Sequence, residues 1–141
     1  MKYLIVSDSH GMTEEMLNLF SKYPNYTKIH LGDFCIDNEI LDNENVIYVK
    51  GNCDFSGEKE IILDTKNGKM LITHGDLYHV KRRIDTIYYK ALECECKYIL
   101  FGHTHKPVID KINDIYFLNP GSLKDGTYIV LENGKPTLIE M

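Results

Sequence analysis

Seven residues of types that bind metal ions lie in five short polar clusters of this sequence. An apolar run precedes each cluster, such as residues 3–6 before the first and 98–101 before the last. Short runs rich in β-branched and aromatic residues are typical of strands, so each cluster is predicted to follow a strand. Ligands at the carboxyl ends of strands lie where open α/β sheets usually carry their chemistry. The clusters are Asp8-Ser9-His10, Gly32-Asp33, Gly51-Asn52, His74-Gly75 and Gly102-His103-Thr104-His105.

The donor types predict a dinuclear centre for divalent transition metals. A mixture of carboxylate and imidazole suits Mn²⁺, Fe²⁺, Co²⁺, Ni²⁺ or Zn²⁺ better than Ca²⁺. Seven donors are too many for one tetrahedral zinc, but they suit two ions about 3.5–4 Å apart that share a carboxylate. Residues i and i+2 of an extended segment face the same side, so we expect Asp8 and His10 to bind one ion together. The glycines beside the donors allow tight turns and close backbone approach.

Length and charge limit the classes of function. A chain of 141 residues is the usual size of one domain, so we expect a single domain over residues 1–141. The formal net charge of −5 argues against a nucleic-acid polymer or an anionic membrane as the main partner. The only dense basic cluster is Lys81-Arg82-Arg83, and a solvated helix face explains it better than a phosphate site. No apolar run has the length of a signal peptide core or a membrane span.

The cysteines predict a reducing environment. There are four of them, and no two form a Cys-x-x-Cys pair. We therefore expect reduced thiols and a cytoplasmic protein. Cys94 and Cys96 are interpreted as small buried or half-buried residues, because a zinc site would need a second pair.

The elements that must position the clusters alternate between strand and helix in the first half of the chain. We expect a helix that Thr13 caps and that ends before Pro24, a short helix over 35–41, and the longest helix over 80–93. The turn signal Lys66-Asn67-Gly68 predicts a hairpin of strands 60–63 and 69–73. The C-terminal part predicts short, mostly antiparallel strands over 108–112, 115–118, 127–131 and 137–139.

With these motifs, the chain resembles the calcineurin-like metallophosphoesterases, and specifically their compact bacterial and archaeal phosphodiesterase branch. The resemblance runs from Asp8 through Asn119-Pro120-Gly121-Ser122. It implies an α/β protein, a four-layer α/β/β/α sandwich with a dinuclear metal centre at one end. By this resemblance Asp8, His10 and His105 hold the first ion, Asn52, His74 and His103 hold the second, and Asp33 bridges both.

The resemblance also implies a reaction. The expected activity is hydrolysis of small phosphate diesters by a bridging hydroxide, with Asn52, His74 and His103 as catalytic residues as well as ligands and Mn²⁺ as the first expectation for the metal. Phosphomonoester hydrolysis is one alternative. A non-catalytic protein like the retromer small subunit is another, although the complete ligand set favours an enzyme. Relatives often dimerise, so a homodimer is a further expectation.

Two positions depart from the wider family. Many relatives have a histidine after Gly-Asn that assists the leaving group, whereas this chain has Cys53, and a thiol is a poor general acid for an alkoxide. Asp54 is therefore a candidate acid, but a turn-stabilising role is the favoured interpretation. Asp76 replaces another frequent histidine without changing the ligand set. His30, inside the second apolar run, is predicted to be a hydrogen-bonded core residue.

Overall fold

The computed structural model describes all 141 residues and contains two five-stranded mixed sheets. The first sheet has the order β10-β9-β1-β2-β3, in which β1, β2 and β3 are parallel and β9 is antiparallel to its two neighbours. Its strands are β1 (Lys2–Val6), β2 (Thr27–His30), β3 (Ile47–Tyr48), β9 (Thr127–Glu132) and β10 (Lys135–Glu140).

The second sheet has the order β4-β5-β6-β8-β7, with a parallel centre formed by β5, β6 and β8. The antiparallel hairpins β4–β5 and β7–β8 form its two edges. Its strands are β4 (Glu60–Thr65), β5 (Gly68–Thr73), β6 (Cys96–Leu100), β7 (Val108–Ile112) and β8 (Ile115–Asn119). The predicted 60–63/69–73 hairpin and the four C-terminal strands are confirmed.

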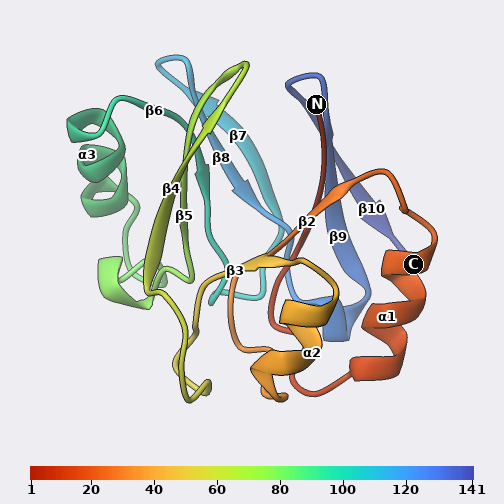
Figure 1. Ribbon diagram of the computed structural model, residues 1–141. Helices are drawn as coiled ribbons and strands as arrows, with labels where there is room; N and C mark the ends of the chain where they lie inside the picture. The colour runs from red at the N-terminus through yellow and green to blue at the C-terminus, as the bar shows by residue number, and fades with distance from the viewer.

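Helices cover only the outer faces of the two stacked sheets. Helices α1 (Thr13–Ser21) and α2 (Asn38–Asn43) lie beside the first sheet, and α3 (Asp85–Glu93) lies on the far side of the second (Figure 1). Two short 3₁₀ turns lie at Asp76–Tyr78, after β5, and at Leu123–Asp125, after β8. The order helix, sheet, sheet, helix confirms the expected four-layer α/β/β/α sandwich.

Three buried clusters of apolar side chains fill the three interfaces between these layers. Alternation along β1 shows how the sequence specifies them: Leu4 and Val6 pack with the helices of the first sheet, while Ile5 packs between the sheets. On β6, Leu100 faces the first sheet and Ile99 packs with the cluster under α3. Because side chains alternate along a strand, a continuous apolar run buries both faces. Each such side chain contributes about 1.5–3 kcal/mol of hydrophobic free energy.

Three details of the helices differ from the expectations. Thr13 is the first residue of α1 and Met12 occupies the N-cap without a side-chain hydrogen bond, so the predicted Thr13 cap is wrong. Helix α2 starts at Asn38, where Asp37 accepts a hydrogen bond from the Glu39 N–H. Its start is later than predicted because Cys35 has a φ of 54°, which no helix accommodates.

The predicted helix over 80–93 is also shorter than expected. Helix α3 begins at Asp85 and has nine residues, so it shares the greatest length with α1. Val80 is buried in the preceding turn, whereas Ile84 and Leu92 are exposed. The predicted helix is too long because the apolar spacing includes Val80, a buried residue of the turn, with the apolar residues of the shorter helix.

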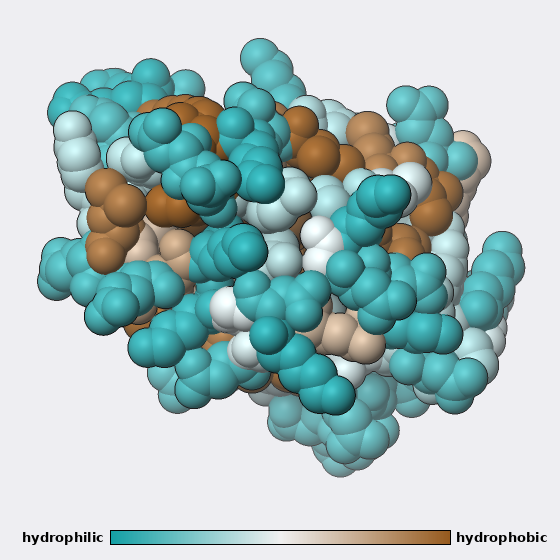
Figure 2. Space-filling model, turned by 90° about the horizontal axis from the view of Figure 1, so that it is seen from above, coloured by the Kyte–Doolittle hydropathy of each residue, from teal (hydrophilic) through white to brown (hydrophobic).

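The end of the molecule that carries the β4–β5, β7–β8 and β9–β10 turns is mainly hydrophilic. Figure 2 shows this end from above, with several separate apolar patches between polar side chains. None of the helices has the length and apolar character needed to cross a membrane. The opposite end, at the bottom of Figure 1, carries the loops with the candidate ligands.

Candidate metal centre

Backbone hydrogen bonds join the loops that follow the parallel strands. The Asp8 N–H donates to the Gly32 carbonyl at 2.9 Å, and the His10 N–H donates to the Asp33 carbonyl at 3.0 Å. In the second sheet, the Gly102 N–H donates to the His74 carbonyl at 2.9 Å. These bonds tie β1 to β2 and β5 to β6 beyond the ends of the strands. The expectation that the ligand loops share one end of the fold is confirmed.

Most of the candidate ligands have unusual backbone conformations. Five of the seven have positive φ angles of 44–70°, a region in which residues other than glycine are uncommon. Such conformations cost about 1–3 kcal/mol each and cluster at functional sites. The prediction that Asp8 and His10 face the same side of an extended segment is therefore wrong in its cause. The two side chains come together through this loop geometry. The five residues are Asp8, His10, Asp33, His103 and His105.

One group of donors consists of Asp8, His10 and His105. The Nε2 atoms of His105 and His10 lie 3.0 and 3.7 Å from Oδ1 of Asp8, and 3.5 Å from each other. Ligands about 2.0–2.2 Å from a common ion are roughly 3.0–3.6 Å apart, so these three atoms have nearly the spacing of a coordination sphere. We call this group the outer cluster, because His10 and His105 are partly exposed.

A second group consists of Asp33, His74 and His103. Nε2 of His74 lies 3.3 Å from Oδ2 of Asp33 and 3.2 Å from Nδ1 of His103. Nδ1 of His74 lies 2.7 Å from the Leu31 carbonyl, to which it donates, so Nε2 is the ring nitrogen that would bind a metal ion after giving up its proton. We call this group the inner cluster, because Asp33 and His74 are buried.

The two clusters adjoin through their carboxylates. Donor atoms of Asp8, Asp33 and His74 all lie within 4.8 Å of one another. His103 and His105, only two residues apart, face different clusters. This arrangement agrees with the ion assignment that the resemblance implies for six of the seven ligands. The donor set and its spacing therefore fit two adjacent divalent ions.

Asn52 lies differently from the other six. Its side chain is exposed, has no hydrogen bond within the protein, and lines a small cavity of about 220 Å³ together with Lys59 and Asp76. The structure thus leaves the amide free, but it does not pair Asn52 with either histidine of the inner cluster. Its role as a ligand stays a prediction.

A glycine makes room for the bridging carboxylate. A Cβ on Gly51 would collide with the Asp33 carboxylate and its backbone N–H. Only a residue without a side chain allows the loop after β3 to approach Asp33 this closely. The predicted need for close backbone approach is confirmed at this position.

Polar residues that the sequence reasoning did not assign hold Asp8 in place. Oδ2 of Asp8 accepts hydrogen bonds from the Ser7 hydroxyl and the His103 N–H, which leaves Oδ1 to face the outer cluster. The Ser122 hydroxyl donates to the Asp8 carbonyl at 2.7 Å, and Asn119 donates to the Gly102 carbonyl. The Asn119-Pro120-Gly121-Ser122 motif is the signal in the sequence for this support, although its contacts with Asp8 and Gly102 are not predictable from it.

His30 is a satisfied core residue, as predicted. It is fully buried, its Nδ1 accepts from the Gly32 N–H at 3.0 Å, and its Nε2 lies 2.8 Å from the Ser9 hydroxyl. Burial and the nearby charge of His74 lower the pKa of His30 to about 3, so its imidazole is neutral at physiological pH. His30 therefore connects the loops of Ser9 and Gly32 without carrying charge.

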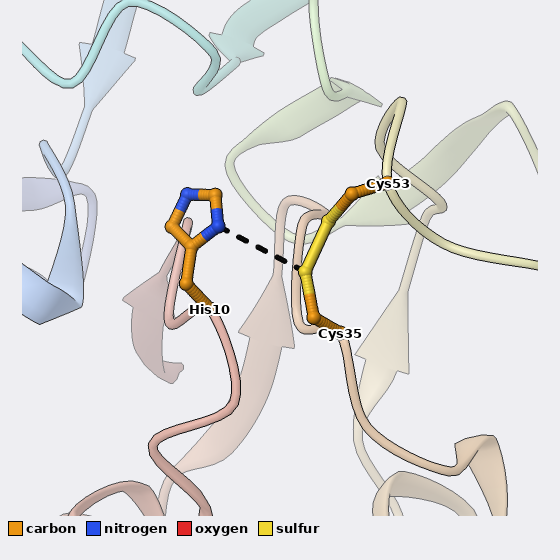
Figure 3. A group of neighbouring side chains, drawn as sticks. All are labelled: His10, Cys35 and Cys53. Carbon is orange, nitrogen blue, oxygen red and sulfur yellow. Dashed lines mark hydrogen bonds between the residues drawn. A yellow bond between two sulfur atoms is a disulfide. The ribbon is translucent and has the colours of Figure 1, made fainter.

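A disulfide joins Cys35 to Cys53 and thereby links the loops of Asp33 and Asn52. Figure 3 shows the bond between the two loops with His10 beside it, and the Cys35 sulfur lies 3.8 Å from Nδ1 of His10. The prediction of reduced thiols is therefore wrong for this pair, because two cysteines 18 residues apart in sequence meet across neighbouring loops. Cys94 and Cys96 are free, as expected.

Asp54 uses its carboxylate to hold these loops together. It accepts hydrogen bonds from the backbone N–H groups of Asp33 at 2.7 Å, Gly51 at 2.8 Å and Cys35 at 2.9 Å. The side chain is buried. These contacts support the favoured interpretation of a turn-stabilising residue over that of a proton donor.

The inner cluster is electrostatically prepared for cations. Burial alone would raise the pKa of Asp33, but hydrogen bonds from His74 and the Cys53 N–H hold this pKa well below its usual range. Burial opposes protonation of His74, yet its hydrogen bond to Asp33 and the charges of Asp8 and Asp33 raise its pKa. Burial and the charge of His74 lower the pKa of His103. Ionised carboxylates around a neutral His103 are a suitable donor set for a divalent ion.

The sequence model of the calcineurin-like phosphoesterase superfamily domain matches residues 1–133. The chain belongs to this superfamily. It is 35% identical over 128 residues to the probable metallophosphoesterase YsnB of Bacillus subtilis, which covers 88% of this chain and 76% of that protein. It is also 26% identical over 157 residues to the phosphodiesterase YfcE of Escherichia coli, with 87% and 79% of the two chains covered.

Proteins whose names do not describe an enzyme also share this fold. The structure of Vps29 from Entamoeba histolytica complexed with Zn²⁺ matches with a TM-score of 0.79 at 19% identity, and the match covers 100% of this chain and 98% of Vps29. Membership of the superfamily implies a metal-dependent hydrolase of phosphate esters. The expected family and fold are confirmed.

Proposed function

We propose that this protein is a metal-dependent phosphodiesterase that hydrolyses small phosphate diesters at a dinuclear centre. The adjoining of the outer and inner clusters, through Asp8, Asp33 and His74, is the observation that supports it most. The family supports the reaction class, and the name of the YfcE relative supports the choice of diesters.

Each ligand has a proposed role. Asp8, His10 and His105 hold one ion, and His74 and His103 hold the other with Asn52, while Asp33 is shared. Bound divalent ions, Mn²⁺ by our proposal, would supply hydroxide near neutral pH and neutralise charge on the phosphoryl oxygens. Ser7 and Leu31 position Asp8 and His74 through hydrogen bonds. His30 holds the adjoining loops through Ser9 and the Gly32 N–H. We further propose that substrates are small esters rather than nucleic-acid polymers.

The leaving group receives no proton from Cys53 or Asp54 in this proposal. Cys53 is part of a disulfide, and Asp54 is committed to three backbone donors. The reaction therefore favours diesters with good leaving groups, because a weakly basic alkoxide or phenoxide needs little protonation. This expectation separates activated aryl esters from simple alkyl esters.

The test combines metal analysis with turnover. We expect two equivalents of divalent metal per chain and faster hydrolysis of an aryl phosphodiester than of an aryl phosphomonoester. Asp110→Asn, an exposed carboxylate on β7, is the matched control for Asp33→Asn. Turnover that persists unchanged in chelator, or in Asp33→Asn, contradicts the proposal, and a metal-free inactive protein would favour the non-catalytic alternative.

A further inference from the structure

The largest cavity of the protein, about 640 Å³, adjoins the candidate metal centre. Its walls are residues 35–38 and residues 53–56, and we call it the Phe55 pocket. The disulfide Cys35–Cys53 joins the two walls on the side nearest His10 (Figure 3). Cys53 also donates its N–H to Oδ1 of Asp33 at 3.0 Å. Each wall is thus in contact with a proposed ligand of the metal ions.

The walls of this pocket are fixed before any ligand binds. Besides the disulfide, the Asn38 amide donates to both the carbonyl and the hydroxyl of Ser56 at 3.0 Å. Asp54 ties its own wall to the Cys35 N–H, and Asp37 caps α2. A preformed pocket of this size suits a small organic group, because little conformational entropy is lost on binding.

The side chains of the pocket select against an anionic ligand. Neither wall contains a lysine, an arginine or a histidine. Asp37 and Asp54 are its only ionisable side chains besides the bridged cysteines, and both are acidic. A second phosphate or a carboxylate would find no cation here, whereas half of the lining residues are hydrophobic. Both carboxylates already accept backbone hydrogen bonds, Asp37 from the Glu39 N–H and Asp54 from three N–H groups, so the pocket suits an uncharged group.

The exposed ring of Phe55 indicates that the bound group is planar and aromatic. It is 102% exposed, whereas the other four phenylalanines of the chain are at most 3% exposed. A fully solvated ring at the rim offers a free aromatic face, and aromatic ligands gain from stacking on such a face as well as from the apolar area that is covered.

From these contacts we propose that the Phe55 pocket binds the uncharged aromatic group of the phosphate ester, which stacks on Phe55 while the phosphate occupies the metal centre. The inference rests on the proposed function and names its substrate class as esters with a neutral planar ring. Phe55 is then a specificity residue, which acts on the ring and not on the phosphate.

Phenylphosphonate and methylphosphonate test the proposal, because they share the charged head group and differ only in the ring. Their affinities for the Mn²⁺-loaded protein are measured by competition against inorganic phosphate in calorimetry. We expect phenylphosphonate to bind about three- to tenfold more tightly, which is the range of one aromatic stacking contact. This preference should disappear in Phe55→Ala and persist in Phe55→Tyr. Tyr89→Ala, an exposed aromatic of α3, is the matched control and should retain it.

A tryptophan variant gives an independent readout. The chain has no tryptophan, so Phe55→Trp introduces a single tryptophan, and its selectively excited emission should change with phenylphosphonate but not with methylphosphonate. An undiminished preference in Phe55→Ala, with both phosphonates bound, overturns the pocket assignment and leaves the metal centre intact. If neither phosphonate binds the loaded protein, the proposed function fails and the inference fails with it.

Discussion

The inner and outer clusters of the candidate metal centre differ in how firmly the fold holds them. The side chains of His74 and Asp33 are 0% and 6% exposed, whereas those of His10 and His105 are 30% and 44% exposed. His74 is oriented by the Leu31 carbonyl, but the second ring nitrogen of His10 faces only a sulfur at 3.8 Å. Ligands that are oriented by other hydrogen bonds bind metals more tightly. We therefore expect the inner ion to be the retained one and the outer ion to exchange.

The difference follows from where the ligands sit in the fold. His74 directly follows β5, which lies between β4 and β6, and a core packs on each face of that strand. His10 and His105 lie further along loops that end in solvent. The buried inner cluster can retain its ion, and the exposed outer cluster leaves space for a substrate to approach. A catalytic metal centre needs both properties.

The largest expected effect comes from the residue shared by both clusters. Asp33→Ala should abolish binding of both ions and lower kcat/KM by roughly 10³-fold, because several kcal/mol of charge stabilisation is lost. Metal content by mass spectrometry and diester turnover check it. Asp110→Ala should leave both unchanged, and an Asp33→Ala protein that keeps two ions would remove the basis of the shared carboxylate.

His74→Ala tests the inner cluster on its own. We expect a loss of more than about 100-fold in affinity for the inner ion, because removal of a ligand costs more than the 10- to 100-fold that follows removal of a residue that only orients one. Excess Mn²⁺ should recover turnover only partly. The outer ion should then be weakened as well, since Asp33, the carboxylate shared by both ions, would no longer be held by a fully occupied inner site. Calorimetric titration of metal into chelator-treated protein measures both sites.

His105→Ala tests the outer cluster in the same way. Because His105 is exposed and its second nitrogen has no partner, the variant should retain one tightly bound ion and recover most of its activity at high Mn²⁺. The same titration should show one unchanged site. If His105→Ala loses the tight site and His74→Ala keeps it, the order of the two clusters is reversed.

The disulfide between the walls of the Phe55 pocket should contribute to stability. Cys35→Ser/Cys53→Ser, or reduction of the bond, should lower the free energy of unfolding by about 3 kcal/mol, as expected for a loop of this length. Urea denaturation with and without dithiothreitol measures the change. Cys94→Ser, which removes a free cysteine, serves as the control and should leave the effect of reductant intact.

His30 predicts the smallest effect, a loss of stability in acid. Its pKa is about 3 in the folded protein and 6.5 in the unfolded chain, so the unfolded chain takes up the proton first as the pH falls. Stability is therefore lost from about pH 6.5 downward, by about 1 kcal/mol between pH 7.5 and 5.5. Urea denaturation of chelated wild-type protein and His30→Gln should show this difference in the wild type alone. Equal losses in both would assign the acid sensitivity to other groups.

The strands were predictable from the sequence, and most of the helices' ends were not. A continuous apolar run such as residues 3–6 buries both faces of a strand, so it identifies β1 without knowledge of its neighbours. Apolar spacing does not distinguish a buried turn residue such as Val80 from a helical one. The helix predicted over 80–93 is for that reason longer than α3.

The candidate site was predictable in its ligand types but not in its supports. Asp8 and Asp33 each follow a strand, and that pattern is visible in the sequence. The contacts of Ser7 and Ser122 with Asp8 depend on loops that meet only in the fold. The same is true of the Cys35–Cys53 bond, since the 6.2 Å between its Cα atoms is a product of tertiary structure.

Anomalous diffraction from a crystal grown with limiting Mn²⁺ tests the central claim most directly. We predict two peaks with unequal occupancy, the stronger one among Asp33, His74 and His103 and the weaker one among Asp8, His10 and His105. A single peak that persists even at saturating Mn²⁺, or two peaks away from these side chains, would contradict a dinuclear centre built from the two clusters.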